Sequence, residues 1–136
     1  MPTQPYRPRV VIADDDDAVC TGVTRLLSPD CDVVGRAADG EALFELVPRL
    51  RPDVVLLDFS LPGDLTGLDI GRRLATTSPQ VRVVALTAHD DQHFRRAAQE
   101  AGFSGFVWKM EVATQLLDTI YAVVGRSSRP AGTGTT

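Results

Sequence analysis

Residues 54–58 read Val54-Val55-Leu56-Leu57-Asp58, a run of four apolar residues that ends in a carboxylate. Three other short apolar runs also end in a polar residue: Val10–Ala13 before Asp14, Val83–Leu86 before Thr87, and Phe106–Trp108 before Lys109. Runs this short and rich in branched residues predict strands buried on both faces of a parallel sheet. Ligands of such a sheet lie in the crevice outside the carboxyl ends of its strands. We therefore expect these polar side chains to meet in one place.

Amphipathic stretches alternate with the apolar runs, which is typical of α/β proteins with helices on both faces of a parallel sheet. The expected strands are 9–14, 32–37, 53–58, 81–87 and 104–109. The expected helices are 17–28, 40–50, 66–77, 90–101 and 111–124. Right-handed crossovers give a three-layer α/β/α sandwich, and this alternation fits the flavodoxin-like strand order 2-1-3-4-5. We expect one domain over 8–125, followed at 126–136 by a flexible tail or the start of a linker.

Composition restricts the classes of function. The chain has 136 residues, with 43% apolar and 24% charged residues, which suits one soluble domain. No membrane span or signal peptide is evident, so a cytoplasmic location is the default prediction. The net charge of −4 argues against this domain binding nucleic acid directly. Cys20 and Cys31 lack metal or redox spacing, and Cys20 is expected to be a buried residue of the first helix.

Four consecutive aspartates, Asp14 to Asp17, span only about 10 Å when extended. Like charges this close raise one another's pKa unless a cation lies between them, and Mg²⁺ suits one or two carboxylates with a phosphate. The alternative is a solvated helix start, where the helix dipole favours carboxylates. We expect that alternative for Asp16 and Asp17, whereas Asp14 and Asp15 end a strand beside Asp58.

A carboxylate next to a metal site can act as a nucleophile, so Asp58 is a candidate for forming an aspartyl phosphate. Lys109 would then pair with a phosphoryl oxygen as a second cation, and Thr87 would donate its hydroxyl to another oxygen. Each residue also has a plain structural interpretation: Asp58 as a loop cap, Lys109 as a surface lysine, and Thr87 as an ordinary strand residue. Their combination at strand ends favours phosphoryl chemistry.

Over about residues 8–125 the sequence resembles the receiver domain of bacterial two-component response regulators. The first and third expected strands are most similar to those of regulators with a helix-turn-helix effector. The resemblance rests on five motifs: Val11-Ile12-Ala13-Asp14-Asp15, Pro52-Asp53-Val54-Val55-Leu56-Leu57-Asp58, Leu61-Pro62-Gly63, Leu86-Thr87-Ala88, and Gly105-Phe106-Val107-Trp108-Lys109.

The resemblance implies a role for each matched residue. Asp58 is the implied phosphoacceptor, and Thr87 and Lys109 contact the phosphoryl group. Phe106 occupies the position of an aromatic switch that turns inward when the threonine hydroxyl is drawn to the phosphate. Mg²⁺ is the implied cofactor, and its implied ligands are the carboxylates of Asp14, Asp15 and Asp58 and the backbone carbonyl of Ser60.

The resemblance also implies partners and an output. A sensor histidine kinase would supply the phosphoryl group, and the chain would act as a signalling switch that catalyses only its own phosphorylation and dephosphorylation. A homodimer would form through the face made by the helix at 90–101, the strand at 104–109 and the helix at 111–124. Transcription would be controlled through an effector domain absent from this chain. The alternative is a stand-alone receiver that acts by protein contact.

Some positions depart from the family pattern or remain open. The six residues from Pro62 to Gly67 are one more than the usual loop, so we expect this loop to protrude. Ser60 and His89 occupy positions that tune dephosphorylation in the family. His89 and His93 also have a spacing found in zinc sites, although a solvated helix end is the simpler interpretation. A partner surface could include four further residues: Arg95, Arg96, Gln99 and Tyr121.

Three other functions fit less well. A phosphatase with an aspartyl nucleophile wants a second carboxylate two residues after the first, where this chain has Ser60. A flavin-binding module would need a Ser/Thr/Gly phosphate loop after the first strand, where four aspartates would repel a phosphate. A degenerate receiver that only binds partners would lack some of the site residues, and all of them are present here.

Overall fold

A single parallel sheet forms the centre of the computed structural model, which describes residues 6–88 and 91–125. Its five strands pair in the order β2-β1-β3-β4-β5, which confirms the predicted flavodoxin-like α/β fold. The strands are β1 (Arg9–Ala13), β2 (Asp32–Ala37), β3 (Val54–Asp58), β4 (Arg82–Thr87) and β5 (Gly105–Trp108).

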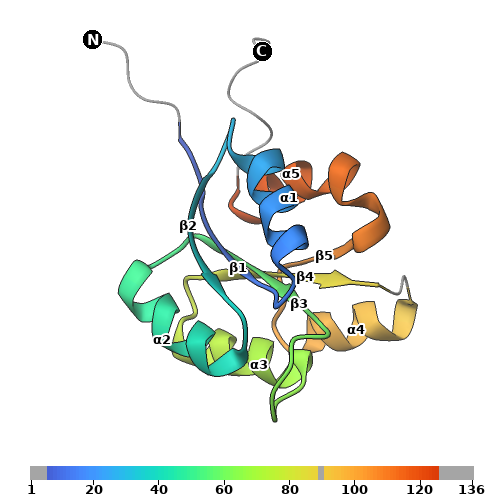
Figure 1. The fold of residues 1–136 in the computed structure, drawn as a ribbon. Helices are drawn as coiled ribbons and strands as arrows, with labels where there is room; N and C mark the ends of the chain where they lie inside the picture. Colours follow the sequence, from blue (N-terminus) through green and yellow to red (C-terminus); the bar gives the residue numbers. More distant parts are fainter. Residues whose placement is uncertain (1–5, 89–90, 126–136) are drawn as a thin grey trace.

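Helices cover both faces of the sheet, with α1 and α5 on one side and α2, α3 and α4 on the other (Figure 1). Within the described ranges, none of them has the length and apolar character that crossing a membrane requires. The helices are α1 (Asp17–Leu27), α2 (Gly40–Leu50), α3 (Gly67–Thr77), α4 (Gln92–Glu100) and α5 (Val112–Val123), and a 3-10 turn, η1 (Lys109–Glu111), precedes α5.

The alternating side chains of the strands build two apolar layers. In β1, Val11 and Ala13 pack toward α2 and α3, whereas Val10 and Ile12 pack toward α1 and α5. Every residue of β3 is buried, as expected for a central strand covered on both faces. Cys20 lies in the layer under α1 and is 5% exposed, which confirms its prediction as a buried residue.

The prediction that strand residues are buried on both faces of the sheet was wrong for the run at 106–108. In β5, Phe106 and Trp108 are only half-buried, because β5 is an edge strand that pairs with β4 alone. The indole Nε1–H of Trp108 donates a hydrogen bond to the carbonyl oxygen of Ala88 at 3.1 Å. The strand ends at Trp108 rather than at residue 109, and Lys109 opens the 3-10 turn.

Helix starts follow their capping residues. The side chain of Asp16 accepts hydrogen bonds from two backbone N–H groups of the first turn, so it is the N-cap of α1. Asp91 caps α4 in the same way, and the helix therefore begins at Gln92 rather than at residue 90. Gly102 follows the end of α4 with a φ of 99°, a left-handed conformation that favours glycine.

The loop between β3 and α3 projects from the edge of the sheet (Figure 1). Its residues Pro62, Gly63, Asp64 and Leu65 are all exposed, whereas Leu61 is buried and holds the start of the loop against the core. The protruding loop expected from its extra residue is therefore confirmed.

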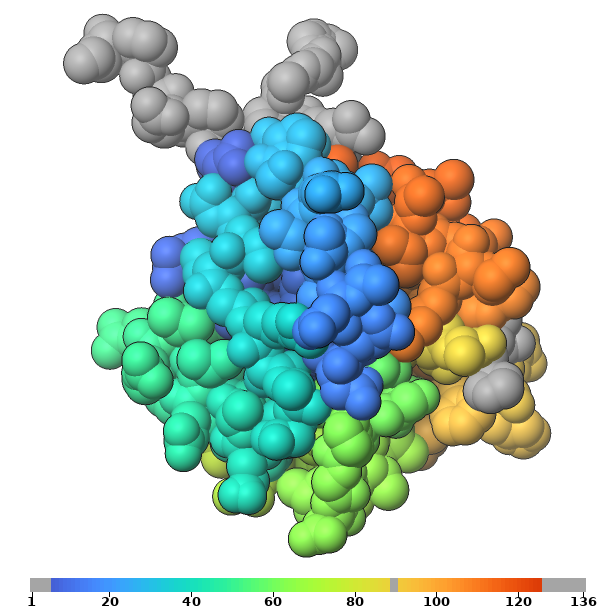
Figure 2. Space-filling view, viewed as in Figure 1, coloured from blue at the N-terminus to red at the C-terminus, as the bar shows by residue number. Residues whose placement is uncertain are grey.

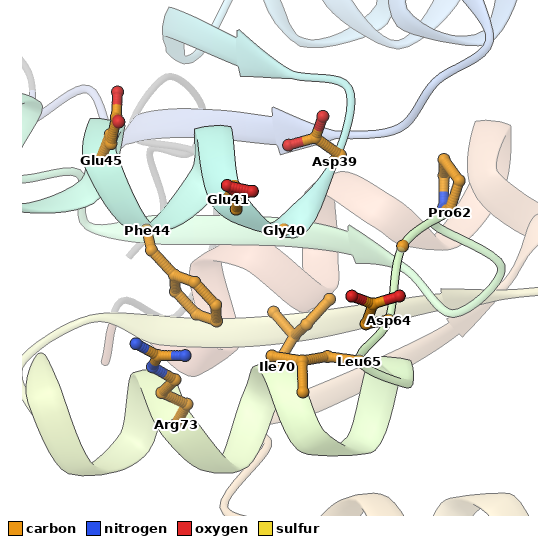
Figure 3. A pocket seen from close by; sticks show the side chains of 11 residues that line it. Asp39, Gly40, Glu41, Phe44, Glu45, Pro62, Asp64, Leu65, Ile70 and Arg73 are labelled. Atoms are coloured by element: carbon orange, nitrogen blue, oxygen red, sulfur yellow. The ribbon is translucent and has the colours of Figure 1, made fainter.

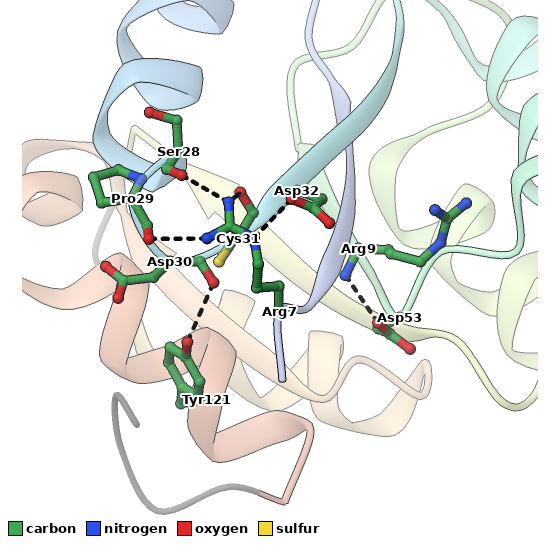
Figure 4. A network of polar contacts seen from close by, with 9 residues as sticks. All are labelled: Arg7, Arg9, Ser28, Pro29, Asp30, Cys31, Asp32, Asp53 and Tyr121. Atoms are coloured by element: carbon green, nitrogen blue, oxygen red, sulfur yellow. Dashed lines mark hydrogen bonds and ion pairs between the residues drawn. The ribbon is translucent and has the colours of Figure 1, made fainter. Parts of the chain in front are cut away.

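At the opposite edge of the sheet, Arg7 joins the start of β1 to the turn between α1 and β2 (Figure 4). Its guanidinium pairs with the Asp32 carboxylate at 2.8 Å and donates to three backbone carbonyl oxygens, at 2.8 to 3.0 Å. Tyr121 of α5 also reaches this turn, and its hydroxyl donates to the carbonyl oxygen of Asp30 at 3.3 Å. Tyr121 is 1% exposed, so its expected place on a partner surface was wrong.

Two glycines one turn apart let α3 approach the sheet closely. A Cβ atom at Gly67 would lie 2.7 Å from a ring carbon of Phe59, and one at Gly71 would lie 2.0 Å from a ring carbon of Phe103. These rings therefore occupy the space that side chains at the two positions would need.

Candidate functional site

The carboxyl edge of the sheet brings together acids that are far apart in the sequence. Asp14 directly follows β1, and Asp58 is the last residue of its neighbour β3. Carboxylate oxygens of Asp14, Asp15 and Asp58 all lie within 4.8 Å of one another. Asp14 and Asp58 are buried, whereas Asp15 is exposed and faces solvent.

Lys109 places a cation inside this acidic group. Its Nζ lies 3.2 Å from Oδ1 of Asp58 and 3.5 Å from Oδ2 of Asp14, although β4 separates β3 from β5. Thr87 ends that intervening strand and is 3% exposed. The four strand-end residues predicted to converge, Asp14, Asp58, Thr87 and Lys109, therefore lie at one edge of the sheet.

The two oxygens of Asp58 have different surroundings. Oδ1 accepts a hydrogen bond from the backbone N–H of Ser60 at 2.9 Å and also pairs with Lys109. Oδ2 accepts no hydrogen bond from the part of the chain that the structure describes. The backbone N–H of Leu61 donates to the Asp58 carbonyl oxygen at 3.1 Å, which fixes the turn after β3. One carboxylate oxygen is thus held in place and the other is available for chemistry.

The surroundings of Asp14 disfavour its ionised form. Burial raises its pKa, and the nearby Asp58 charge raises it further. A hydrogen bond from the backbone N–H of Asp16 and the charge of Lys109 oppose this effect without cancelling it. For Lys109, burial would lower the pKa, but the carboxylates of Asp58 and Asp14 outweigh burial and raise it. Lys109 therefore stays charged near neutral pH.

The donor atoms of this site fit a hard divalent cation. Oδ2 of Asp14 is buried and accepts no hydrogen bond from the described residues; it has only the ion pair with Lys109 at 3.5 Å, which leaves a buried carboxylate oxygen incompletely satisfied. Three carboxylates close together are oxygen ligands of the kind that Mg²⁺ prefers. Ser60 lies at the rim of the same group through its N–H contact with Asp58, and the role of its carbonyl as a ligand stays a prediction.

The other two acids of the Asp14–Asp17 run have structural roles, as expected. Asp16 caps α1, and Asp17 pairs with Arg36 of β2 at 2.6 Å. His89 lies outside the described residues, so neither its effect on dephosphorylation nor its pairing with His93 is tested. The backbone N–H of His93 donates to the capping carboxylate of Asp91.

Phe106 lies on the outer side of the site, half-buried in β5. The guanidinium carbon of Arg95, on α4, lies 5.1 Å from the centre of its ring. On the other side its ring meets Phe59 edge-on, with 6.1 Å between centroids and an interplanar angle of 88°. Phe59 directly follows Asp58, so a short aromatic path joins the acidic site to the face of α4 and β5.

Sequence reasoning missed Phe59. Its ring also contacts Phe103, with centroids 5.3 Å apart, and Phe94, with centroids 5.9 Å apart. An aromatic residue immediately after a candidate nucleophile was the available signal. Its partners could not be identified without knowing how closely α3 and α4 approach the sheet.

Comparison with known proteins gives one consistent result. A model of the response regulator receiver domain matches residues 10–121. Response regulator GacA of Pseudomonas viridiflava is 37% identical over 118 residues, covering 85% of this chain and 54% of that protein. Transcriptional regulatory protein DegU of Brevibacillus brevis is 34% identical over 117 residues, covering 85% and 49% respectively.

Solved structures agree. A two-component response regulator of the LuxR family from Aurantimonas sp. SI85-9A1 aligns with a TM-score of 0.83 and 32% identity, covering 90% of this chain and 89% of that one. The isolated REC domain of RcsB from Salmonella enterica serovar Typhimurium, solved with the phosphomimetic BeF3−, aligns with a TM-score of 0.82 and 27% identity, covering 90% and 92%.

An α/β sandwich with carboxylates and one lysine at the carboxyl edge of its sheet defines a class of signalling domain. The chain belongs to the response regulator receiver domain family of two-component systems. Its relatives include transcriptional regulators and LuxR-family regulators. The chain spans about half the length of the curated relatives it matches.

Proposed function

We propose that Asp58 accepts a phosphoryl group from the phosphohistidine of a sensor histidine kinase. The observation that supports this most directly is the unequal environment of its two oxygens, because Oδ1 is held by Ser60 and Lys109 whereas Oδ2 accepts no hydrogen bond from the described residues. Oδ2 attacks phosphorus, an O–P bond forms, and the P–N bond breaks. The bonding pair leaves with the imidazole nitrogen, which then takes a proton from solvent.

The surrounding residues stabilise the charge that this reaction brings in. We propose that Lys109, whose Nζ lies 3.2 Å from Asp58, pairs with a phosphoryl oxygen and that the hydroxyl of Thr87 donates to another. Mg²⁺ is the proposed cofactor, held by Asp14, Asp15, Asp58 and the Ser60 carbonyl, and it supplies positive charge that neutralises the transferring group. The chain would thus be a switch that catalyses only its own phosphorylation and dephosphorylation, not an enzyme acting on other substrates.

The proposed output is a change at the face formed by α4, β5 and α5. Phosphorylation adds about −1.5 to −2 charge at one carboxylate, so it signals only if two conformations differ in their interaction with that group. Thr87 and Phe106 are the proposed link, and movement of Phe106 would break its contact with Arg95. This face is also the proposed homodimer contact.

Control of transcription is the proposed purpose of the switch. The curated relatives are about twice as long as the matched region, and one of them is named a transcriptional regulatory protein. We propose 8–125 as the receiver domain and 126–136 as a tail or the start of a linker to an effector domain. With its net charge of −4, the domain itself is not proposed to bind nucleic acid.

Intact-mass measurement tests the proposal directly. Incubation with acetyl phosphate and Mg²⁺ should add the mass of one phosphoryl group, and a chelator should prevent the addition. Asp58→Asn should abolish it. Asp118→Asn makes the same replacement at an exposed carboxylate of α5, and this variant should still gain the mass of one phosphoryl group. Continued labelling of the Asp58→Asn variant would place the acceptor elsewhere.

A further inference from the structure

A groove separates the start of α2 from the start of α3, with the protruding β3–α3 loop at one end (Figure 3). In Figure 2 the crevice lies at the lower edge of the molecule, between the teal residues that open α2 and the light-green loop. Its volume is about 600 Å³, within the range of sites that bind small molecules or a few side chains. Apolar side chains of Phe44, Leu65 and Ile70 form its floor.

Negative charge surrounds this apolar floor. Glu41 and Glu45 of α2 and Asp64 of the loop line the groove, and all three are exposed. Within the described part of the chain, their carboxylates have no hydrogen-bond or ion-pair partner. The groove has one cation, Arg73, whose guanidinium lies 4.4 Å from the centre of the Phe44 ring. We call these residues, floor and rim together, the acidic groove.

We propose that the acidic groove binds a short basic segment of a partner protein. An apolar side chain of that segment would cover Leu65 and Ile70, and its Lys or Arg residues would face Glu41, Glu45 and Asp64. The charge of the rim opposes other occupants, because Glu41, Glu45 and Asp64 would repel nucleic acid and anionic lipid surfaces. The interaction does not require phosphorylation, so it stands apart from the proposed phosphotransfer.

Two-dimensional NMR of the ¹⁵N-labelled chain tests this proposal with defined probes. The tetrapeptide acetyl-Lys-Leu-Leu-Lys-amide should shift amide signals of the loop and of the first turns of α2 and α3, with a Kd on the order of 1 mM. The acetyl-Glu-Leu-Leu-Glu-amide analogue should produce no such shifts. Lysine amide alone should bind more weakly than the tetrapeptide, because it cannot cover the apolar floor.

Variants separate the groove from general charge. The double variant Glu41→Gln, Asp64→Asn should weaken tetrapeptide binding about fivefold. Glu100→Gln, Asp118→Asn removes the same charge from exposed carboxylates of α4 and α5 and should bind as the wild type does. Leu65→Ser keeps every charge and should weaken binding by removing part of the floor.

Each of the following results would overturn the proposal. The first is the absence of shifts around the groove at millimolar peptide. The second is equal weakening by the two double variants, which would indicate attraction to net charge alone. The third is equal binding of lysine amide and the tetrapeptide, or no effect of Leu65→Ser, because either would show that the site takes a simple cation and not a peptide segment.

Discussion

Replacing Asp14 by Asn should stabilise the metal-free protein and abolish its stabilisation by Mg²⁺. Asp14 is fully buried, and its pKa is raised by burial and by the Asp58 charge. The folded state therefore keeps this carboxylate ionised at a cost in free energy. An Asn side chain removes the charge and still accepts the hydrogen bond from the Asp16 N–H, which is 2.9 Å long.

The magnitude follows from the distances. With an effective dielectric constant near 20, attraction to Lys109 at 3.5 Å amounts to about 5 kcal/mol. Repulsion from Asp58, whose oxygen lies within 4.8 Å, amounts to about 3.5 kcal/mol or more. Exposed Asp15 adds a smaller repulsion. The attraction to Lys109 and the repulsion from the two carboxylates therefore nearly cancel, and the free-energy cost of burying the Asp14 carboxylate remains. Because burial is the largest cause of the raised pKa of Asp14, we expect Asp14→Asn to raise the free energy of unfolding by about 1–2 kcal/mol.

Urea unfolding followed by circular dichroism, near pH 7.5 and with either EDTA or Mg²⁺, measures this effect. Mg²⁺ should raise the midpoint for the wild type and leave it unchanged for Asp14→Asn. Asp118→Asn, at an exposed position, should match the wild type under both conditions. Because the folded pKa of Asp14 is raised, the advantage of the variant should grow as pH rises through that pKa and vanish in acid. An Asp14→Asn protein that is less stable than the wild type in EDTA would refute the reasoning.

Three further predictions concern packing and burial. Gly71→Ala should cost about 2–3 kcal/mol in urea unfolding, because its Cβ would lie 2.0 Å from a ring carbon of Phe103, and Phe103→Leu in the same chain should recover part of the loss. Burial raises the pKa of Cys31 from 9.0 to about 11. The free energy of unfolding of the wild type should therefore fall by on the order of 2 kcal/mol, relative to that of Cys31→Ala, as the pH rises from 9 to 11. A difference in unfolding free energy between the two proteins that stays constant over this pH range would contradict the prediction. Tyr121→Phe should lower the free energy of unfolding by about 1 kcal/mol, because it removes the hydrogen bond to the Asp30 carbonyl, and an unchanged urea midpoint would show that this bond contributes nothing.

The site was predictable from sequence to the extent that strand ends define it. Parallel strands have their carboxyl ends at one edge, so an apolar run followed by Asp58 or Lys109 fixes where that residue lies. The same logic placed Asp14, and the expected place of Asp16 at a helix start agrees with its role as the N-cap of α1. Local signals of this kind depend on few residues and do not require knowledge of packing.

Features that depend on how helices sit against the sheet were not predictable. Tyr121 was expected at the surface, but the rotation of α5 turns it toward the α1–β2 turn. The ring of Phe59 has three aromatic neighbours from other segments, Phe94, Phe103 and Phe106, and it occupies space that a side chain at Gly67 of α3 would need. The acidic groove arises between two helices and a loop; the extra residue of the loop was visible in the sequence, but the way the loop and the two helices enclose an apolar floor was not.

The fold separates the two edges of its sheet by the length of a strand. β1 begins beside the Arg7 network and α5 ends near the start of β4, where Arg82 donates to the Val123 carbonyl oxygen at 3.2 Å. Asp58 lies at the other edge, about 17 Å away for a five-residue strand. A surface tether or fluorescent label attached near the start of β1 or the end of α5 would therefore leave Asp58 accessible to a phosphodonor. This makes the domain suitable for immobilised binding and phosphorylation assays.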